Sequence, residues 1–459
     1  MTVIKGLLKS KELEDILRSE IKKHLKPGDF LMPEMQLAEK YSVGRITVRK
    51  AVEGLVNEGL LQRIQGKGTF VTNPRENNKR LNILLSKGSF RGYEPLPGDN
   101  EFQANGRKWN VNINLLQERS ELENDLPKFF SSEDIDLVYV HEGIIQYLAK
   151  NRMVLNLDKF IEKSGVIRKN DFEPHAMKTF LWNNSAYGLP LFYSPLVLYY
   201  NKDIFDAYGL QYPDNTWKWD DMVEAASTMT GVNQKVGKWK TFGLGLYQIN
   251  KNLLAAMVRQ NGGDFYDAEG KCVLDSPEAV EAMQFCSDLS NKLHIVPTIH
   301  FIDQNFSLKE MFCNKYLGMF IGFYDDYVYL KENFNGRWDV EELPMGKRRS
   351  SPLSVQGWAI SSKSRRKAEA FEFLESFYRN FNKKPFIRFL TRIPAYSFPS
   401  GILPVPFIRS LEYARPAHDS PKKFNPEEFR MGFINLWTGF EKAEDVCKTF
   451  CAKFNNESE

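Results

Sequence analysis

The sequence lacks the features of secreted and membrane-spanning proteins. Its N-terminal residues, MTVIKGLLKSKELED, contain no apolar core of signal-peptide length, and no run of about 18 apolar residues occurs anywhere in the 459-residue chain. Cysteine is scarce as well. The five cysteines are irregularly spaced and odd in number, which argues against a disulfide framework and fits a reducing compartment. We therefore expect a cytoplasmic protein with no membrane partner.

The common signatures of metal and cofactor sites are also missing. The six histidines form no ligand pair at metal spacing, and two thiols alone, Cys447 and Cys451, rarely make a zinc site. Gly243 and Gly245 are not followed by the third glycine of a dinucleotide fingerprint. We expect no metal site, no cofactor and no enzymatic activity.

What the chain does contain is distributed unevenly. Residues 1–80 hold 3 of the 61 aromatic side chains and carry 16 Lys and Arg against 10 Asp and Glu. Residues 81–459 hold the other 58 aromatics and have a slight excess of acidic residues. A polar segment with one proline, residues 74–80, has the composition of a linker. The sequence thus predicts a small basic domain at 1–73 and a large aromatic-rich domain at 81–459.

The residue pattern of the first domain is typical of a DNA-binding fold. Helical periodicity predicts three helices, at residues 12–25, 34–41 and 45–57. Two short strands follow, at 60–64 and 69–72, and a Gly-rich turn joins them. Three helices and a hairpin of this kind form an α+β winged helix-turn-helix domain, whose third helix enters the major groove of DNA.

Polar side chains of the third helix and the hairpin are the candidate DNA contacts. In the helix they lie off an apolar stripe formed by Val48, Val52 and Leu55. Arginine offers a bidentate fork to guanine or phosphate, and threonine offers a hydroxyl group to a phosphate oxygen. In the hairpin, glycines allow the backbone to approach a sugar-phosphate strand closely. For any single residue, a solvated charged face is the alternative interpretation. The candidates are Arg45, Thr47, Arg49 and Lys50 in the helix, and Gly66, Lys67 and Gly68 in the hairpin.

Residues 12–73 resemble the GntR family of bacterial transcription regulators. The most specific pieces are Arg45-Ile46-Thr47-Val48-Arg49 and Gly66-Lys67-Gly68-Thr69-Phe70-Val71. The chain departs from the family pattern at Pro33, where a serine N-cap is usual, at Met35, where relatives often have a base-reading arginine, and at Gly44, where the family has Ser or Thr. The resemblance implies double-stranded operator DNA as a partner, bound by a homodimer at a two-fold symmetric site. We expect the large domain to build the dimer.

The second domain opens with an α/β pattern. Apolar strands are predicted at 81–85, 111–116 and 135–140, and a helix is predicted near 121–131. In open α/β sheets, ligands bind beyond the carboxyl ends of the strands. Glu142, which follows the third strand together with His141, is therefore a candidate ligand contact, with a plain loop position as the alternative.

Three later stretches carry a second resemblance. The first begins with Tyr187-Gly188-Leu189-Pro190 and continues to Trp217. The second begins with Gln260-Asn261-Gly262-Gly263-Asp264 and continues to Glu278, and the third begins with Leu343-Pro344-Met345-Gly346 and continues to Ser361. In order and spacing they resemble bacterial extracellular solute-binding proteins of the sugar-binding kind, over about residues 81–410. The resemblance implies a two-lobe α/β fold of the periplasmic-binding-protein type II, with the ligand between the lobes. We expect one lobe at about 81–190 and 296–345 and the other at about 191–295 and 346–459. Helix 366–380 and the C-terminal stretch 426–453 are expected on the second of these lobes.

A sugar ligand also fits the aromatic excess. Pyranose faces pack on aromatic rings, and hydroxyl groups need carboxylate or amide partners. Core packing is the alternative for every single aromatic residue. The candidates come from segments expected to reach the cleft, and they are Glu142, Tyr193, Tyr247, Gln248, Tyr324, Asp325, Gln356 and Trp358.

Together the two domains predict a one-component transcription regulator that binds operator DNA and senses a sugar or oligosaccharide. The first alternative is the same regulator with a peptide, a polyamine or a metal complex as its ligand. The second is a GntR head fused to an aminotransferase-like enzyme that uses pyridoxal phosphate. That enzyme needs a Schiff-base lysine in a Ser-Lys segment followed by small residues and proline, and Ser362-Lys363-Ser364-Arg365-Arg366 lacks this context.

Overall fold

The computed structural model of the chain contains two compact units, residues 1–81 with 108–112, and residues 82–107 with 113–459. Each unit is described by itself. No helix in the described part of the chain is long and apolar enough to cross a membrane. The residues that the structure describes are 2–26, 28–57, 60–64, 68–71, 80–86, 101–104, 107–116, 126–131, 133–232, 240–247, 250–298, 307–381, 393–394, 403–417 and 426–456.

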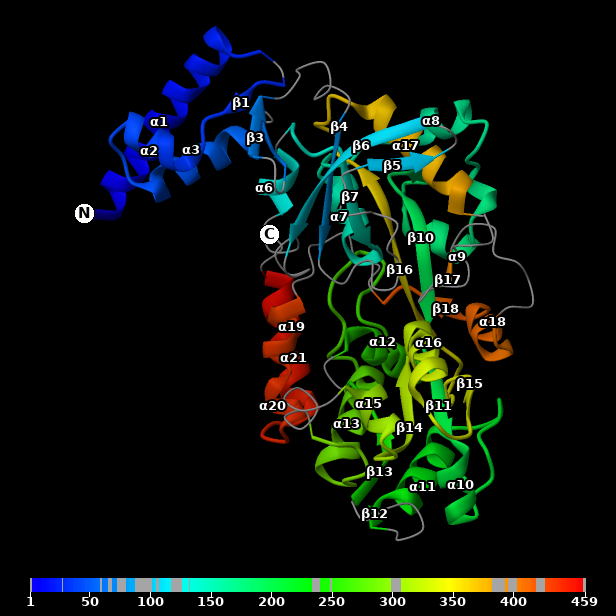
Figure 1. Ribbon diagram of the computed structural model, residues 1–459. Coiled ribbons are helices and arrows are strands. Elements are labelled where there is room, and N and C mark those ends of the chain that lie inside the picture. The colour runs from blue at the N-terminus through cyan, green and yellow to red at the C-terminus, as the bar shows by residue number, and fades with distance from the viewer. Residues whose placement is uncertain are drawn as a thin grey trace. The chain divides into compact units, whose positions relative to one another are not determined.

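The first unit has the predicted winged helix-turn-helix elements (Figure 1). Its first helix starts at Thr2 rather than at residue 12, because no proline interrupts the segment between them. A short strand that the sequence pattern did not predict pairs with the hairpin, so that the sheet order is β1-β3-β2. The elements are α1 (Thr2–His24), β1 (Phe30–Leu31), α2 (Glu34–Lys40), α3 (Arg45–Asn57), β2 (Leu61–Ile64) and β3 (Gly68–Val71).

The core of the first unit follows the helical repeat. Leu13 and Leu17 of α1 lie four residues apart on one face, and they are buried in one cluster with Val48 and Val52 of α3. Each such side chain contributes about 1.5–3 kcal/mol on burial. The predicted stripe of α3 is confirmed. Ile16, which shares the apolar spacing of α1, is 47% exposed and lies at the edge of that face.

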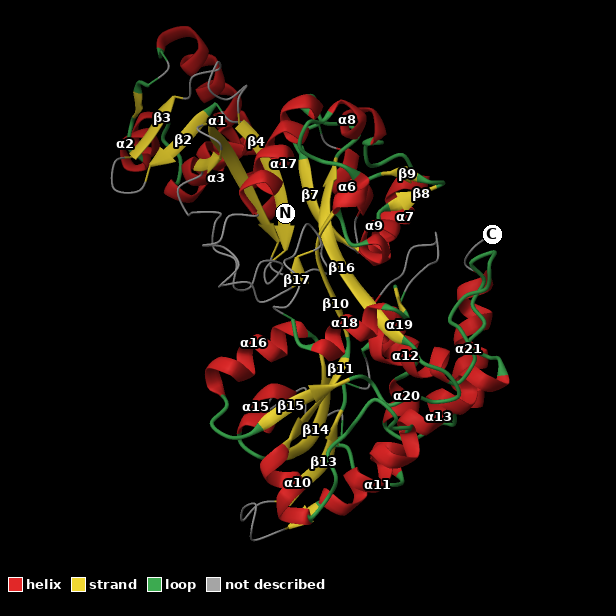
Figure 2. Cartoon of the chain, turned by 90° about the vertical axis from the view of Figure 1, so that its right-hand side faces the viewer, coloured by secondary structure: helices red, strands yellow, loops and turns green. Residues whose placement is uncertain are grey.

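The second unit contains two α/β lobes, each built on its own sheet (Figures 1 and 2). The first-lobe sheet has the order β17-β10-β16-β7-β4-β6-β5, with β18 paired to β16. Its strands are β4 (Arg80–Ser86), β5 (Glu101–Ala104), β6 (Arg107–Leu116), β7 (Leu137–His141), β10 (Leu189–Pro195), β16 (Ser351–Ile360), β17 (Ile393–Pro394) and β18 (Ala414–Arg415). A separate hairpin consists of β8 (Leu181–Trp182) and β9 (Ser185–Ala186).

The second-lobe sheet has the order β12-β13-β14-β11-β15, in which β13 and β14 are parallel. Its strands are β11 (Val197–Asn201), β12 (Gly231–Val232), β13 (Lys240–Gly245), β14 (Leu317–Gly322) and β15 (Trp338–Glu341). The first-lobe helices are α6 (Leu126–Ser131), α7 (Glu142–Lys150), α8 (Asp158–Lys163), the 3-10 turn η1 (Lys169–Asp171), α9 (Pro174–Thr179) and α17 (Lys367–Phe381). The other helices of this unit are α10 (Lys202–Tyr208), α11 (Trp219–Met229), α12 (Lys251–Gln260), α13 (Pro277–Asn291), α15 (Leu308–Cys313), α16 (Tyr324–Asn333), α18 (Val405–Leu411), α19 (Pro426–Gly432), α20 (Ile434–Trp437) and α21 (Ala443–Asn456).

Two crossovers between the lobes are bonded to each other. Strand β10 continues through Leu196 into β11, and β16 returns beside β10 in antiparallel register. At this point the Leu196 N–H donates to Ser351 Oγ at 3.2 Å, and the Ser351 hydroxyl donates to the Leu196 carbonyl at 3.1 Å. Both residues are buried, so these bonds fix the two crossovers side by side.

The predicted division between the lobes needs correction. Residues 296–345 were expected in the first lobe, but β14 and β15 both pair with β11 of the second. Helix α17 was expected on the second lobe, but it packs on the first, where the Tyr378 hydroxyl donates to the carbonyl of Leu189 at 3.0 Å. The reason is that strand pairing between distant segments, which local sequence patterns do not encode, decides lobe membership. The C-terminal helices do pack in the second-lobe core as predicted, through Phe433, Trp437 and Phe450.

Candidate DNA-binding and ligand-binding sites

Two candidate DNA-contact side chains of α3, together with Arg63 of β2, which was not a candidate, lie around one carboxylate. Glu34, the first residue of α2, lies 3.6 Å from Arg45 Nε, 3.7 Å from Arg49 Nε and 2.9 Å from Arg63 Nη2. The side chains of Arg45 and Arg49 remain 65% and 60% exposed. Exposed ion pairs of this kind contribute little to stability, about 0–1 kcal/mol. Their effect is to hold three guanidinium groups together on one open surface, where they can bind phosphate or guanine.

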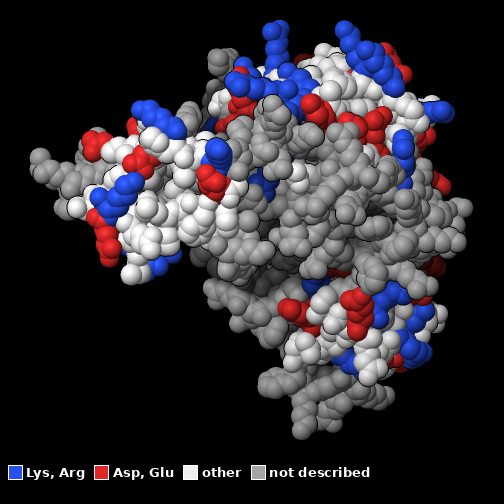
Figure 3. Space-filling model, turned by 45° about the horizontal axis from the view of Figure 1, so that its top comes forward, with Lys and Arg blue, Asp and Glu red and all other residues white. Residues whose placement is uncertain are grey.

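The remaining candidate DNA contacts differ in how exposed they are, and two of them lie outside the described residues. Lys50 is exposed and Thr47 is half-buried, with its N–H bonded to the Gly44 carbonyl at 2.9 Å. In the hairpin, Gly68 has a φ of +112°, and a Cβ there would clash with the Phe30 ring. Gly66 and Lys67 lie outside the described residues. On the visible face of the first unit, basic and acidic side chains are interspersed (Figure 3).

Two large apolar side chains that were not among the candidate DNA contacts neighbour these residues in the sequence. Ile46 is 74% exposed and Met35 is 63% exposed. Ile46 lies between two candidate contacts, and Met35 follows Glu34. The helical periodicity of α2 and α3 places these two apolar side chains off the buried face. Large apolar side chains exposed next to basic residues are a signal of a binding surface, and this signal could have identified them.

Two of the predicted ligand residues line a pocket of about 240 Å³ in the second lobe. Tyr247 follows β13, and its hydroxyl oxygen accepts from the Leu308 N–H at 3.1 Å. Asp325 lies in the first turn of α16. The pocket also has polar groups that sequence reasoning missed, namely Asn250, Ser307, Lys309 and Asp326. The set of carboxylate, amide, ammonium and aromatic groups can bind a hydroxyl-rich ligand.

Asp326 is the most perturbed carboxyl group of this pocket. Its Oδ2 accepts from the Phe323 N–H at 3.0 Å. Burial, and secondarily the neighbouring charge of Asp325, raise the pKa of Asp326 to about 7. The adjacent acidic pair at the end of a buried strand is the sequence signal that could have identified it.

Two predicted tyrosines are mostly buried, and only Tyr324 is adjacent in sequence to residues that line this pocket. The Tyr324 N–H donates to Ser194 Oγ at 2.9 Å, and its ring stacks on that of Tyr327 with centroids 5.6 Å apart. Burial raises the pKa of Tyr324 to about 12. Tyr193 is 6% exposed in β10, paired to Val355, and burial raises its pKa also. Neither is among the residues that line the pocket.

Two further candidates lie in the first-lobe sheet. Gln356 accepts a hydrogen bond from the Tyr139 hydroxyl at 3.2 Å. Trp358 is fully buried, with its ring at an edge-on angle to those of Tyr139 and Phe377, which is the position of a core residue. Glu142 begins α7, but its side chain, like the whole of Gln248, lies outside the described residues.

A second, larger cavity of about 1060 Å³ was not predicted at all. Its lining comes from both lobes, and none of the predicted ligand residues belongs to it. Among the residues that the structure describes, no group of three His, Cys, Asp or Glu side chains could hold a metal ion. The lining residues are Gln146, His175, Lys178, Thr179, Leu181, Trp182, Asn183, Asn184, Arg259, Arg348, Arg349, Ser350, Glu412, Tyr413, Ala414, Arg415 and Pro416.

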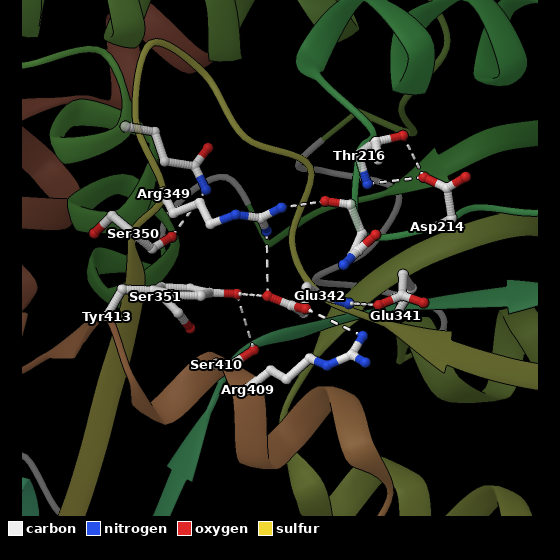
Figure 4. A network of polar contacts seen from close by, with 12 residues as sticks. Asp214, Thr216, Glu341, Glu342, Arg349, Ser350, Ser351, Arg409, Ser410 and Tyr413 are labelled. Carbon is white, nitrogen blue, oxygen red and sulfur yellow. Dashed lines mark hydrogen bonds and ion pairs between the residues drawn. The ribbon is translucent and has the colours of Figure 1, made fainter.

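A polar network borders this cavity (Figure 4). Glu342, which follows β15, is buried and accepts from the Tyr413 hydroxyl at 2.5 Å and from Arg349 Nη1 at 3.2 Å. Arg409 of α18 approaches the same carboxylate at 3.9 Å. The network therefore links the end of β15, the start of β16 and the α18 segment, and it compensates the charge of Arg349.

Comparison with protein families identifies both parts of the chain. Residues 91–382 match the family of bacterial extracellular solute-binding proteins, and residues 9–71 match the bacterial regulatory proteins of the GntR family. An arabinooligosaccharide-binding protein of Halalkalibacterium halodurans is 32% identical over 154 residues, which is 32% of this chain and 29% of that protein. The uncharacterized HTH-type transcriptional regulator YurK of Bacillus subtilis is 51% identical over 65 residues, 14% of this chain and 27% of that protein.

Among solved structures, the ABC substrate-binding protein of Listeria monocytogenes in complex with cycloalternan has a TM-score of 0.68 and 19% identity, and the match covers 82% of this chain and 98% of that one. This likeness shows the two-lobe fold. The aligned segments span less than a third of the length of the two sequence relatives above.

Proposed function

The chain belongs to the family of bacterial extracellular solute-binding proteins and begins with a GntR-family DNA-binding domain, and we propose that it is a cytoplasmic, one-component transcription regulator that senses a sugar. The observation that carries this proposal is the union of the two parts in one chain. An exposed arginine cluster on a recognition helix precedes a two-lobe ligand-binding fold. Because the DNA-binding domain must reach chromosomal DNA, we place the protein in the cytoplasm. Its ligand must therefore be a compound that is present in the cytoplasm.

The smaller pocket supports a sugar as the ligand class. Asp325 and Asn250 can bind sugar hydroxyl groups, and Tyr247 and Phe323 offer ring faces. One relative is named for arabinooligosaccharides, and these are the first probes to test. Ligand binding changes operator affinity through the relation between the two heads of a homodimer. The coupling can be no larger than the ligand's difference in affinity for the two states. We propose no enzymatic activity.

Two measurements test this function. Thermal melting with arabinooligosaccharides, maltooligosaccharides, peptides and polyamines identifies the ligand class, since a ligand at about 100 times its Kd adds about 2.7 kcal/mol. Stabilisation by non-sugars alone would refute the sugar assignment. Fluorescence anisotropy on operator fragments, selected from genomic DNA, should then show an affinity that changes when the stabilising sugar is added. An unchanged affinity would refute the sensor role.

The pocket itself is tested by Asp325→Asn. The substitution removes a charged acceptor, and sugar affinity should fall about 10-fold or more. Calorimetric titration measures the change. Asp220→Asn, at an exposed position in the first turn of α11, is the matched control and should leave the affinity unchanged. Equal affinities in the two variants would place the sugar elsewhere.

A further inference from the structure

The larger cavity of the second unit has an excess of positive charge. Five of its lining side chains are Lys178, Arg259, Arg348, Arg349 and Arg415, whereas Glu412 is the one carboxylate among the described lining residues. The smaller pocket has the opposite balance, with Asp325 and Asp326 against Lys309. The two cavities therefore differ in the charge of the ligand that they favour.

Two of the five cations are already compensated. Arg259 is 4% exposed, and its Nε donates to Asp264 Oδ1 at 2.9 Å. Arg349 donates to the buried carboxylate of Glu342 (Figure 4). For Lys178, Arg348 and Arg415, no carboxylate of the described chain lies within ion-pair distance. After these pairings, the lining retains three cations against one carboxylate.

Arg348 is also held in place. Its Nε donates to the Arg259 carbonyl at 2.5 Å, and its Nη2 donates to the Gly263 carbonyl at 3.2 Å. Backbone carbonyls at the end of α12 thus fix the guanidinium group without neutralising it. A charge that is positioned in advance binds an anion with a smaller loss of side-chain entropy.

The cavity lining also has groups that suit a sugar ring. Asn183 and Asn184 form the two-residue turn of the β8–β9 hairpin, in which Trp182 pairs with Ser185. Their φ values of +48° and +63° are those of a type I′ turn, which asparagine tolerates well. Both amides are exposed, and Trp182 beside them is half-buried and lines the cavity. Amides bind hydroxyl groups and an indole face packs against a pyranose ring.

We propose that this cavity is a second ligand site, distinct from the smaller pocket, and that it binds a phosphorylated sugar. Lys178, Arg348 and Arg415 bind the phosphate group, and Trp182, Asn183 and Asn184 contact the sugar ring. Lys178 and Trp182 belong to the first lobe, whereas Arg348 precedes β16 on the side of the second lobe. A ligand that bridges these residues favours one relative position of the lobes, and it acts as an effector beside the neutral sugar.

The test compares glucose 6-phosphate, glucose and inorganic phosphate by calorimetric titration of the full-length protein. Glucose 6-phosphate should bind at least about 10-fold more tightly than either of the others, because only it uses both halves of the site. Affinity for inorganic phosphate equal to that for glucose 6-phosphate would overturn the assignment. So would equal affinity for glucose and its phosphate.

Variants locate the site. The double variant Lys178→Gln/Arg415→Gln should lose glucose 6-phosphate binding by about 10-fold or more, since each charged hydrogen bond contributes substantially. Both side chains are exposed, and Lys178→Gln alone serves if the double variant melts early. Lys448→Gln, at an exposed position of α21 away from both cavities, is the matched control and should leave the affinity unchanged. Retained binding in the double variant would refute the proposal, and loss of binding in Lys309→Gln would then place the phosphate in the smaller pocket. The binding of neutral sugars in the smaller pocket is tested independently by Asp325→Asn, so either proposal can fail without the other.

Discussion

Glu34 in the first unit and Glu342 in the second each gather arginine side chains, but they differ in burial. The side chain of Glu34 is 21% exposed, and the arginines around it are 39–65% exposed. The side chain of Glu342 is 4% exposed, and it accepts a short hydrogen bond from Tyr413 as well. One arrangement therefore presents its cations to solvent, and the other uses them inside the protein.

This difference explains why similar pairs have different consequences. An exposed cluster contributes little to stability, because water screens it, and its charges stay available to a nucleic acid. A buried carboxylate must be bonded, because an unpaired charge in the interior is costly. The same pairing of glutamate with arginine can therefore form a binding surface or stabilise the interior, and the degree of burial decides which.

The largest expected effect on stability comes from changing the buried carboxylate, Glu342. Glu342→Gln should lower the free energy of unfolding of the second unit by about 2–3 kcal/mol, because it removes a charged acceptor from Tyr413 and Arg349. Urea unfolding followed by tryptophan fluorescence measures the change. Glu332→Gln, at an exposed position in α16, is the control. A loss no greater than that of the control would show that the network does not brace the crossover.

The next effect concerns the exposed cluster. Arg45→Ala and Arg49→Ala should each weaken operator binding by about 1–3 kcal/mol, because each removes a contact to base or phosphate. Their melting temperatures should stay close to that of the parent protein, since both side chains are largely exposed. Anisotropy on operator DNA measures the affinities. Unchanged affinity in both variants would remove these residues from the DNA-binding surface.

The smallest effect is expected at Glu34. Glu34→Gln should change the free energy of unfolding by less than about 1 kcal/mol, because exposed ion pairs contribute little. It should raise the affinity for random DNA, since a negative charge is lost beside the arginines, and lower the ratio of operator to random binding. Parallel titrations with the two DNAs measure this ratio. A ratio that stays the same would mean that Glu34 does not align the arginine side chains.

The sequence was most informative where structure is local. The stripe of α3 could be predicted because Val48, Val52 and Leu55 repeat with the period of the helix. The lobe membership of β14 could not, because its neighbours in the sheet, β13 and β11, come from distant parts of the chain. Trp358 was expected at the ligand, but β16 is buried along nearly its whole length, so no alternation distinguishes inward from outward positions.

The two pockets illustrate the same limit. Tyr247 and Asp325 could be found because each lies in a segment that the resemblance places at the cleft. The larger cavity could not, because its lining combines short pieces of α7, α9, the β8–β9 hairpin, α12 and the segments before β16 and around β18. Few of these pieces show a pattern of their own, and only the folded chain brings their charges together.

The reciprocal bonds between Leu196 and Ser351 have a mechanical consequence. Two strands that ran independently between the lobes would permit twisting, sliding and bending, each with its own stiffness. Because the Ser351 hydroxyl group joins them where the chain passes between the lobes, the two crossovers should move together as one hinge. The ligands proposed for the two cavities would then act on the same hinge movement, and their effects on it would add or oppose one another.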